Sequence, residues 1–380
     1  ALCTQNLATE LSPTIDDASE YFGTTLWVAD DTSPRTLTGF GHQPDFLWVK
    51  HRGSGSISHT LVDSSRGGDK MLTSNTNATE DTKSHGEITS FNADGITVAD
   101  GTSGSYPRLY FNDLNPFGSG GGNYVAWHWV ANGGTTTSFT ESGSNPGGTY
   151  QANTTAGFSV ITYTGTGSAG TFPHGLGKRP KFIIFKARTA VERPWIPSEL
   201  ITGNANGGML LDRTDAEYTL GTNNVDASQI DSTNIHVKTS GGVNTDAVDY
   251  VCWAWAEIEG YSKFGTYTGN GSSDGTFVYT GFRPAFVIVK CSSSSQSGNA
   301  HWVMYDVKRN TYNVVDELLF ANLTNNESVN DSSRPMDILS NGFKLRGSGS
   351  ASNSSGATYI YMAFAENPFV TSGATPVTAR

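Results

Sequence analysis

One ten-residue phrase occurs three times in this chain. Residues 41–50 read GHQPDFLWVK, residues 177–186 read GKRPKFIIFK, and residues 281–290 read GFRPAFVIVK. A second phrase follows each copy: NYVAWHWVA at 123–131, DYVCWAWAE at 249–257 and TYIYMAFAE at 358–366. The first phrase precedes the second by 82, 72 and 77 residues. A constant order at similar spacing indicates three copies of one unit of roughly 105 residues, which is long enough to bury a core of its own.

Both phrases have the pattern of β-strands. The run at 180–186 is apolar on both faces, which is typical of a central strand covered on two sides. The second phrase alternates, so Val125, Trp127 and Trp129 share one face, which we expect to be the core. Trp253 and Met362 occupy the position of Trp127 in the other copies. Abundant Gly, Ser, Thr and Asn, with 11% aromatic residues, fit strands joined by turns.

The sequence therefore predicts an all-β protein made of three tandem β-sandwich, jelly-roll-like domains of about 105 residues each. We expect modest contacts between the domains, as between beads on a string. The expected boundaries are a lead-in segment at 1–22, repeat 1 at 23–132, a Gly/Ser/Thr linker at 133–156, repeat 2 at 157–260, repeat 3 at 261–369, and a C-terminal tail at 370–380.

Composition argues against several classes of function. The formal net charge is -11 and no Lys/Arg-rich run occurs, so nucleic acid is not an expected partner. No apolar run approaches 18 residues, so no membrane span is expected. The three cysteines lack C-x-x-C spacing, which favours a reducing cytosol as the place of synthesis and gives no zinc site. We expect no metal and no cofactor.

The sequence contains no convincing catalytic group. Residues 271–275 match the G-x-S-x-G pattern, but they lie between two expected strands, whereas a nucleophile elbow needs a strand-to-helix turn. Asp16 and Asp17, like Asp30 and Asp31, are adjacent, and adjacent strand residues face opposite ways. We therefore expect no catalytic residues and no enzyme.

Two polar segments stand out between the strand phrases, at 63–77 and 302–326. Both are rich in amides and hydroxyls, and the second also carries a tryptophan. Such loops suit carbohydrate binding, although solvated loops without a ligand have the same composition. The candidate host-contact residues are Arg66, Asp69, Asn75, Trp302, Asn310 and Asn325.

The phrases also resemble a known kind of domain. The stretches YFGTTLWVADD, DSSRGGDKMLTSNTNATEDT, GYSKFGTYTGNGSSDGTFVYTGFRPAFVIVK and GATYIYMAFAENPF resemble a domain of unassigned function in bacteriophage structural proteins, often tail-fibre-like. The resemblance covers nearly the whole chain and supplies no catalytic residues. The lead-in LCTQNLATELSPTI resembles the segment that follows a lectin-like domain of the SPRY type, which implies the distal part of a longer fibre.

These observations predict a virion structural protein that attaches to the host surface by adhesion. It would be made in the host cytoplasm and exposed on the particle. The expected partners are other virion proteins, a host glycan or receptor, and further copies of the chain in a homotrimer, because open sheet edges need cover. A capsid decoration protein is the first alternative. A glycan-cleaving, tailspike-like enzyme is the second, although no carboxylate pair for it is evident.

Overall fold

The structure is a computed structural model, and it describes residues 15–367 apart from residues 54, 119–120, 220–223, 240–241 and 295–297. Strands dominate the described residues, and the one α-helix among them is the single turn α1 (Glu199–Thr202). Short 3-10 turns lie at Ala18–Glu20, Pro116–Gly118 and Ala227–Gln229. The all-β class predicted from the sequence is confirmed.

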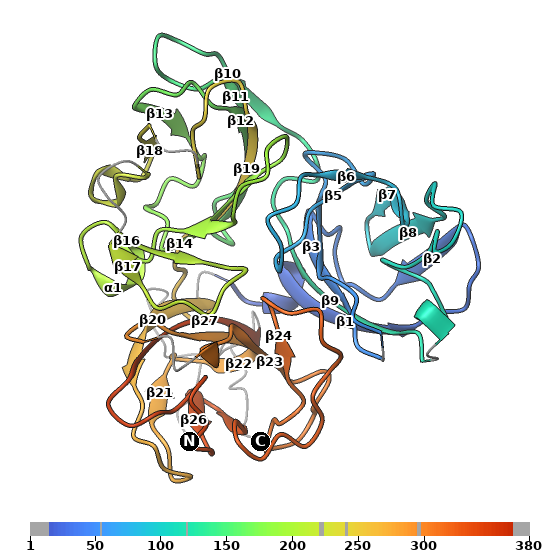
Figure 1. Ribbon diagram of the computed structural model, residues 1–380, viewed down its shortest axis with the longest axis vertical. Helices are drawn as coiled ribbons and strands as arrows, with labels where there is room; N and C mark the ends of the chain where they lie inside the picture. Colours follow the sequence, from blue (N-terminus) through green and yellow to red (C-terminus); the bar gives the residue numbers. More distant parts are fainter. Residues whose placement is uncertain are drawn as a thin grey trace, which may run out of the picture.

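Three groups of strands follow one another along the chain (Figure 1). Repeat 1 contains β1 (Phe22–Val28), β2 (Arg35–Thr38), β3 (Phe46–His51), β4 (Thr60–Asp63), β5 (Lys70–Met71), β6 (Asp81–Thr82), β7 (Glu87–Asn92), β8 (Gly95–Ala99) and β9 (Asn123–Trp129). Repeat 2 contains β10 (Thr137–Phe139), β11 (Gly148–Asn153), β12 (Phe158–Thr164), β13 (Gly170–Pro173), β14 (Phe182–Ala187), β15 (Trp195–Ile196), β16 (Gly207–Leu210), β17 (Tyr218–Thr219), β18 (Asn234–Val237) and β19 (Asp249–Trp255). Repeat 3 contains β20 (Ser262–Thr268), β21 (Phe277–Tyr279), β22 (Arg283–Cys291), β23 (Val303–Asp306), β24 (Leu319–Phe320), β25 (Met336–Leu339), β26 (Gly342–Leu345) and β27 (Thr358–Asn367).

The three groups share one strand order. The order β1-β9-β3-β4 in repeat 1 corresponds to β12-β19-β14-β15 in repeat 2 and to β20-β27-β22-β23 in repeat 3. A second sheet contains β2 beside β8, and the corresponding pairs are β13 with β18 and β21 with β26. The two sequence phrases are thus the paired strands β3 and β9 and their counterparts.

Each four-strand set is covered on both faces, which explains why the first phrase is apolar throughout. In repeat 1 one face packs against the second sheet, where Leu47 and Tyr124 lie in a core with Ile96. The other face, with Phe46 and Trp127, enters a separate core. All six residues of β3 and of β14 are consequently buried.

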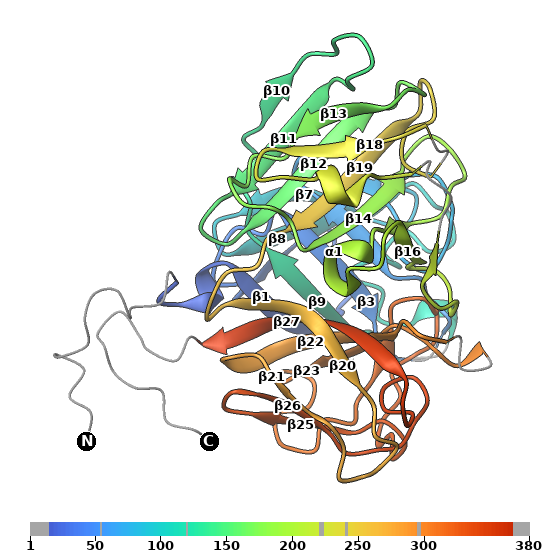
Figure 2. The ribbon, with the colours of Figure 1, turned by 90° about the vertical axis from the view of Figure 1, so that its left-hand side faces the viewer.

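That separate core is shared by all three repeats. It lies where the three groups of strands meet in Figure 1, while the second sheets lie further out (Figures 1 and 2). The ring of Phe22 stacks on Phe364 at 5.0 Å and that of Phe46 on Trp253 at 4.9 Å between centroids. Trp127, Trp253 and Met362 are 0%, 0% and 4% exposed, as predicted for their shared position. The core leaves a cavity of only about 10 Å³.

The expectation of beads on a string is therefore wrong. The alternating face that the sequence marks as core is a contact between repeats. Repeats 1 and 2 each also have a second core of their own, whereas the interior of repeat 3 is continuous with the shared core. The sequence pattern shows that a face is apolar, but it does not show which part of the chain covers it.

The segment at 133–156 is not a free linker. It contains β10 and β11, and β11 pairs with β12 along six positions from Gly148–Tyr163 to Asn153–Phe158. Gln151 is 1% exposed, and its side chain bonds Ser64 and Ser65 of repeat 1. A segment rich in Gly and Thr is a flexible linker only when its backbone N–H and C=O groups have no hydrogen-bonding partners in a neighbouring strand. Here β12 provides those partners.

Candidate functional site

Most of the buried Asp, Lys and Arg side chains lie where one repeat packs on the next. We name each contact by the two repeats that it joins. Residues 306–327 of repeat 3 pack on repeat 1 at the 3–1 junction, and residues 63–80 of repeat 1 pack on repeat 2 at the 1–2 junction. Residues 198–217 of repeat 2 pack on repeat 3 at the 2–3 junction. Each repeat therefore contacts both of the other repeats, through a different surface for each. The three junctions together form a closed ring within a single chain.

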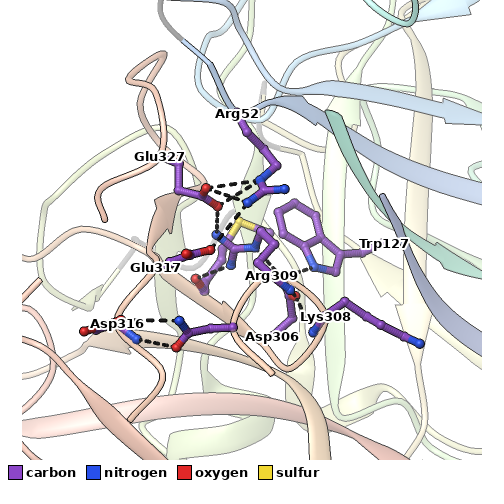
Figure 3. Close-up of polar contacts among 10 residues, drawn as sticks. Arg52, Trp127, Asp306, Lys308, Arg309, Asp316, Glu317 and Glu327 are labelled. Atoms are coloured by element: carbon purple, nitrogen blue, oxygen red, sulfur yellow. Dashed lines mark hydrogen bonds and ion pairs between the residues drawn. The ribbon is translucent and has the colours of Figure 1, made fainter. Parts of the chain in front are cut away.

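Arg309 is the centre of the 3–1 junction (Figure 3). Its guanidinium donates to Asp306 at 2.5 Å, to Glu327 at 2.9 Å and to the Met304 carbonyl oxygen at 3.0 Å. From repeat 1, the Trp127 indole N–H donates to Asp306 at 3.0 Å, and the Arg309 guanidinium lies 5.5 Å from the centroid of that ring.

Arg52 completes this cluster from repeat 1. It donates to Glu327 at 2.8 Å, and it also approaches Glu317 at 3.4 Å. Burial alone would lower the pKa of Arg309, but the Asp306 and Glu327 carboxylates outweigh it and raise that pKa. A buried charge is tolerated only when it is paired and hydrogen-bonded, and every member here is.

The 1–2 junction repeats this arrangement closely. Arg66 donates to Asp63 at 2.6 Å and to Glu80 at 2.8 Å, and its guanidinium lies 5.6 Å from the centroid of the Trp253 ring. The Trp253 indole donates to Asp63 at 3.1 Å, and Arg188 donates to Glu80 at 2.9 Å. Burial would raise the pKa of Glu80, but the two guanidiniums hold it below its usual value.

The 2–3 junction keeps the glutamate as Glu217, which accepts from the hydroxyls of Ser198 and Thr202, and lacks the other members of the set. The backbone N–H of Glu217 bonds the Ser292 carbonyl oxygen, just as Glu80 bonds Arg188 and Glu327 bonds Arg52. Ser292 therefore stands in the place of the arginine, and Met362 stands in the place of the tryptophan. By strand register Ser198 and Ile201 replace the Asp and Arg of the other junctions. The aspartate, both arginines and the tryptophan are thus replaced together by uncharged or apolar residues, while the glutamate remains and bonds hydroxyl groups instead.

The lysine that ends each first phrase links neighbouring repeats. Lys50 donates to the Thr324 carbonyl oxygen of repeat 3, Lys186 to that of Thr76 in repeat 1, and Lys290 to that of Asp215 in repeat 2. Burial lowers the pKa of Lys50 to about 7 and of the other two to about 8. Because a lysine ends every copy of the first phrase, each junction contains a lysine that donates to a carbonyl oxygen of the neighbouring repeat.

The predicted host-contact residues do not form one exposed site. Arg66 is 9% and Trp302 is 1% exposed, so both are corrected to junction residues. The Trp302 indole donates to the Leu210 carbonyl oxygen of repeat 2 at 3.0 Å. Asp69, Asn75 and Asn310 are half-buried, and Asn325 is exposed. Asn75 bonds His59 and Ser58, and Asn310 bonds Asp316.

Sequence reasoning missed the junction clusters although a signal was present. Asp63 and Arg66 have the same three-residue spacing as Asp306 and Arg309. This spacing lets the backbone N–H of the arginine bond the carboxylate that its own guanidinium also binds. The polar composition of the segments suggested solvated loops, because a satisfied buried ion pair and a surface ion pair contain the same residues.

The hydrogen bonds and ion pairs of these junction residues connect neighbouring repeats. Glu317 and Glu327 are the closest approach to an acid–base pair, since burial and Glu327 raise the pKa of Glu317. Arg52 lies within ion-pair distance of both carboxylates, however, at 3.4 Å from Glu317 and 2.8 Å from Glu327. Within the described ranges no group of three or more His, Cys, Asp and Glu could hold a metal ion. No helix in those ranges is long and apolar enough to cross a membrane.

Comparison with known proteins gives one match. No curated protein matches the chain, and no solved structure matches it. The family model described as a domain of unknown function (DUF7483) matches residues 17–368, which include all three repeats and all three junctions. The ring is thus the unit that the family model covers, and the chain belongs to the DUF7483 family.

Proposed function

We propose that this chain is a structural part of a bacteriophage virion, in a tail fibre or similar appendage that attaches to the host surface by adhesion. The observation that carries the proposal is the closed ring. Its buried arginines, carboxylates and lysines join repeats to one another. A rigid body that presents several outer surfaces suits attachment, because linked weak contacts act together with high avidity.

We further infer that the ring arose from one β-sandwich unit used three times. The matching strand orders and the recurring first phrase support this inference. Each unit turns its second sheet away from the shared core, so the ring offers three comparable outer faces (Figure 1). Such faces can diverge while the junctions stay fixed.

Competition tests the adhesion proposal. Purified protein should bind permissive host cells and should lower the adsorption rate of the phage, whereas a resistant host should bind neither. A polysaccharide clearing assay on the same cells separates adhesion from cleavage. Absence of cell binding, or clearing of the polysaccharide, would remove the proposal.

A capsid decoration protein is the alternative, and the threefold arrangement of the repeats favours it. A body with three similar sides fits a site where three capsid subunits meet. Antibody labelling of intact virions distinguishes the two, since label on the tail supports the appendage and label on the head supports decoration.

The homotrimer is part of the proposal and has its own test. Because all three junctions close within one chain, a trimer would have to form through other surfaces. A native mass of three chains in dilute solution would support it. A mass of one chain would remove the trimer and leave the ring as the source of multiple contacts.

A further inference from the structure

The outer face of the second sheet of repeat 3 carries two exposed aromatic rings. Phe277 and Tyr279 on β21 are 44% and 64% exposed, while Val278 between them is 5% exposed. Alternate residues of a strand face opposite sides, so both rings lie on the outer face and Val278 lies in the core. β21 pairs with β26 in the lower part of Figure 2.

Charged side chains border the rings on the same face. The strand register places Phe277 beside Lys344 and Lys344 beside Asp337. Lys344 pairs with Asp274 at 2.6 Å, and Arg346 pairs with Asp337 at 2.6 Å. The border therefore contains two positive and two negative groups and has no net charge, and the Asp274 side chain is 82% exposed.

The other repeats show that the fold does not need aromatic residues here. Tyr279 pairs with Gly342 as Thr38 pairs with Gly95 and Pro173 with Asn234. The positions of Phe277 and Tyr279 are thus Thr36 and Thr38 in repeat 1, and Thr171 and Pro173 in repeat 2. Two aromatic rings on the same face of one strand form an exposed apolar surface that the other repeats lack, and contiguous exposed apolar surface is typical of interaction sites.

We propose that this aromatic face, formed by Phe277, Tyr279, Asp274, Asp337, Lys344 and Arg346, binds an uncharged sugar of the host-surface polysaccharide. The C–H face of a pyranose ring packs on an aromatic ring, and its hydroxyls exchange hydrogen bonds with the charged border. The site specifies the ligand class of the proposed adhesion and therefore rests on that function.

Other occupants fit this face less well. A stable protein interface buries roughly 800 Å² on each partner, which is far more than two partly exposed rings provide. Nucleic acid needs clustered positive charge, whereas the border is neutral and the chain carries a net charge of -11. A sugar requires a small area, an apolar platform and mixed hydrogen-bonding groups, and the face supplies all three.

The test is the double substitution Phe277→Thr with Tyr279→Thr, which installs the residues of repeat 1. The matched control is Thr36→Ala with Thr38→Ala on the corresponding face of repeat 1. Labelled wild-type protein is applied to a printed array of neutral and acidic oligosaccharides and to polysaccharide extracted from a permissive host. The expected result is binding to neutral glycans that weakens at least about tenfold in the double variant and not in the control.

The outcomes separate this inference from the adhesion proposal. If wild-type protein binds host cells but no carbohydrate, or if the double variant binds as wild type does, the aromatic face is not the site and adhesion stands. If wild-type protein binds no host cells, adhesion itself fails. Equal melting temperatures of the three proteins would show that lost binding is not lost folding.

Discussion

Arg309 illustrates how strongly one residue is tied to its surroundings in this ring. Both carboxylates that it binds are buried, so its removal leaves Asp306 without its cationic partner and Glu327 with Arg52 alone. Removal of one member of a buried ion pair typically costs about 3–5 kcal/mol. We expect Arg309→Ile to lower the free energy of unfolding by that amount in urea denaturation. The adjacent, exposed Lys308 is the control, and Lys308→Met should change it by less than about 0.5 kcal/mol.

Joint removal of charge should cost less than single removal. The double variant Asp306→Ser with Arg309→Ile installs the residues of the 2–3 junction and leaves Glu327 with Arg52 alone. Replacing a buried pair by uncharged residues is often close to neutral, so the double variant should be more stable than Arg309→Ile. A double variant that is less stable than the single one would show that the charges contribute independently.

Buried histidines set the response to acid. Burial lowers the pKa of five buried histidines, to about 4 for His51, and also that of the half-buried His301; the five are His42, His51, His59, His128 and His174. His59 is a clear case, because it accepts from the Trp48 indole through one ring nitrogen and donates to the Phe320 carbonyl oxygen through the other. That pair of bonds requires the neutral ring.

The sign of the pH dependence follows from these directions. An unfolded histidine gains its proton near pH 6.5, whereas the folded one resists it, so the unfolded state binds more protons below pH 6.5. The contribution of the histidines to stability is therefore complete above pH 6.5 and is lost as pH falls. We expect the melting temperature to drop steadily from pH 7 to pH 5. A constant value over that range would show that the rings are charged, or exposed, in the folded state.

At the scale of strands, much of the fold could be predicted from the sequence. The repeated phrases are paired strands, and the alternating face of the second phrase is buried as expected. What covers that face could not be read from its pattern, because burial against a second sheet and burial against another repeat need the same apolar residues. The two-sided apolar run at 180–186 was the available signal, since a two-layer sandwich leaves one face of such a strand exposed.

A sequence pattern is equally unable to show what surrounds the candidate host-contact residues. Many polar groups of segments 63–77 and 302–326 bond other protein groups. Ser74 bonds the Ala321 carbonyl oxygen across the 3–1 junction, for example. Composition records how many hydrogen-bonding groups a loop has, and only the fold decides whether water or another repeat satisfies them.

Strand β11 provides a test of whether segment 133–156 is part of the fold or a linker. The Gln151 amide oxygen accepts from the backbone N–H groups of Asn132 and Gly134, and its nitrogen donates to Ser64 and Ser65. Gln151→Ala removes these four part-buried hydrogen bonds, each worth about 0.5–1.5 kcal/mol, and should cost about 1–3 kcal/mol in chemical denaturation. Ser138→Ala, on the exposed β10, should be nearly neutral. A neutral Gln151 variant would restore the linker interpretation.

At the scale of the whole molecule, ring closure should make unfolding cooperative. The shared aromatic core contains residues of every repeat, so no repeat can unfold without exposing apolar surface of the other two. Independent domains would instead melt in separate steps. The family match over residues 17–368 agrees with a single structural unit.

Two tryptophans at different junctions test this coupling. Trp127→Ala disrupts the 3–1 junction and Trp253→Ala the 1–2 junction, and each removes a buried ring at a cost of about 3–5 kcal/mol. In calorimetry and far-UV circular dichroism, both variants should show one transition, shifted to lower temperature by similar amounts. Tyr312→Ala, which removes an 84% exposed ring, should leave the transition unchanged. A second transition that stays at the wild-type temperature in either tryptophan variant would mean that the repeats unfold independently and that the shared core does not couple them.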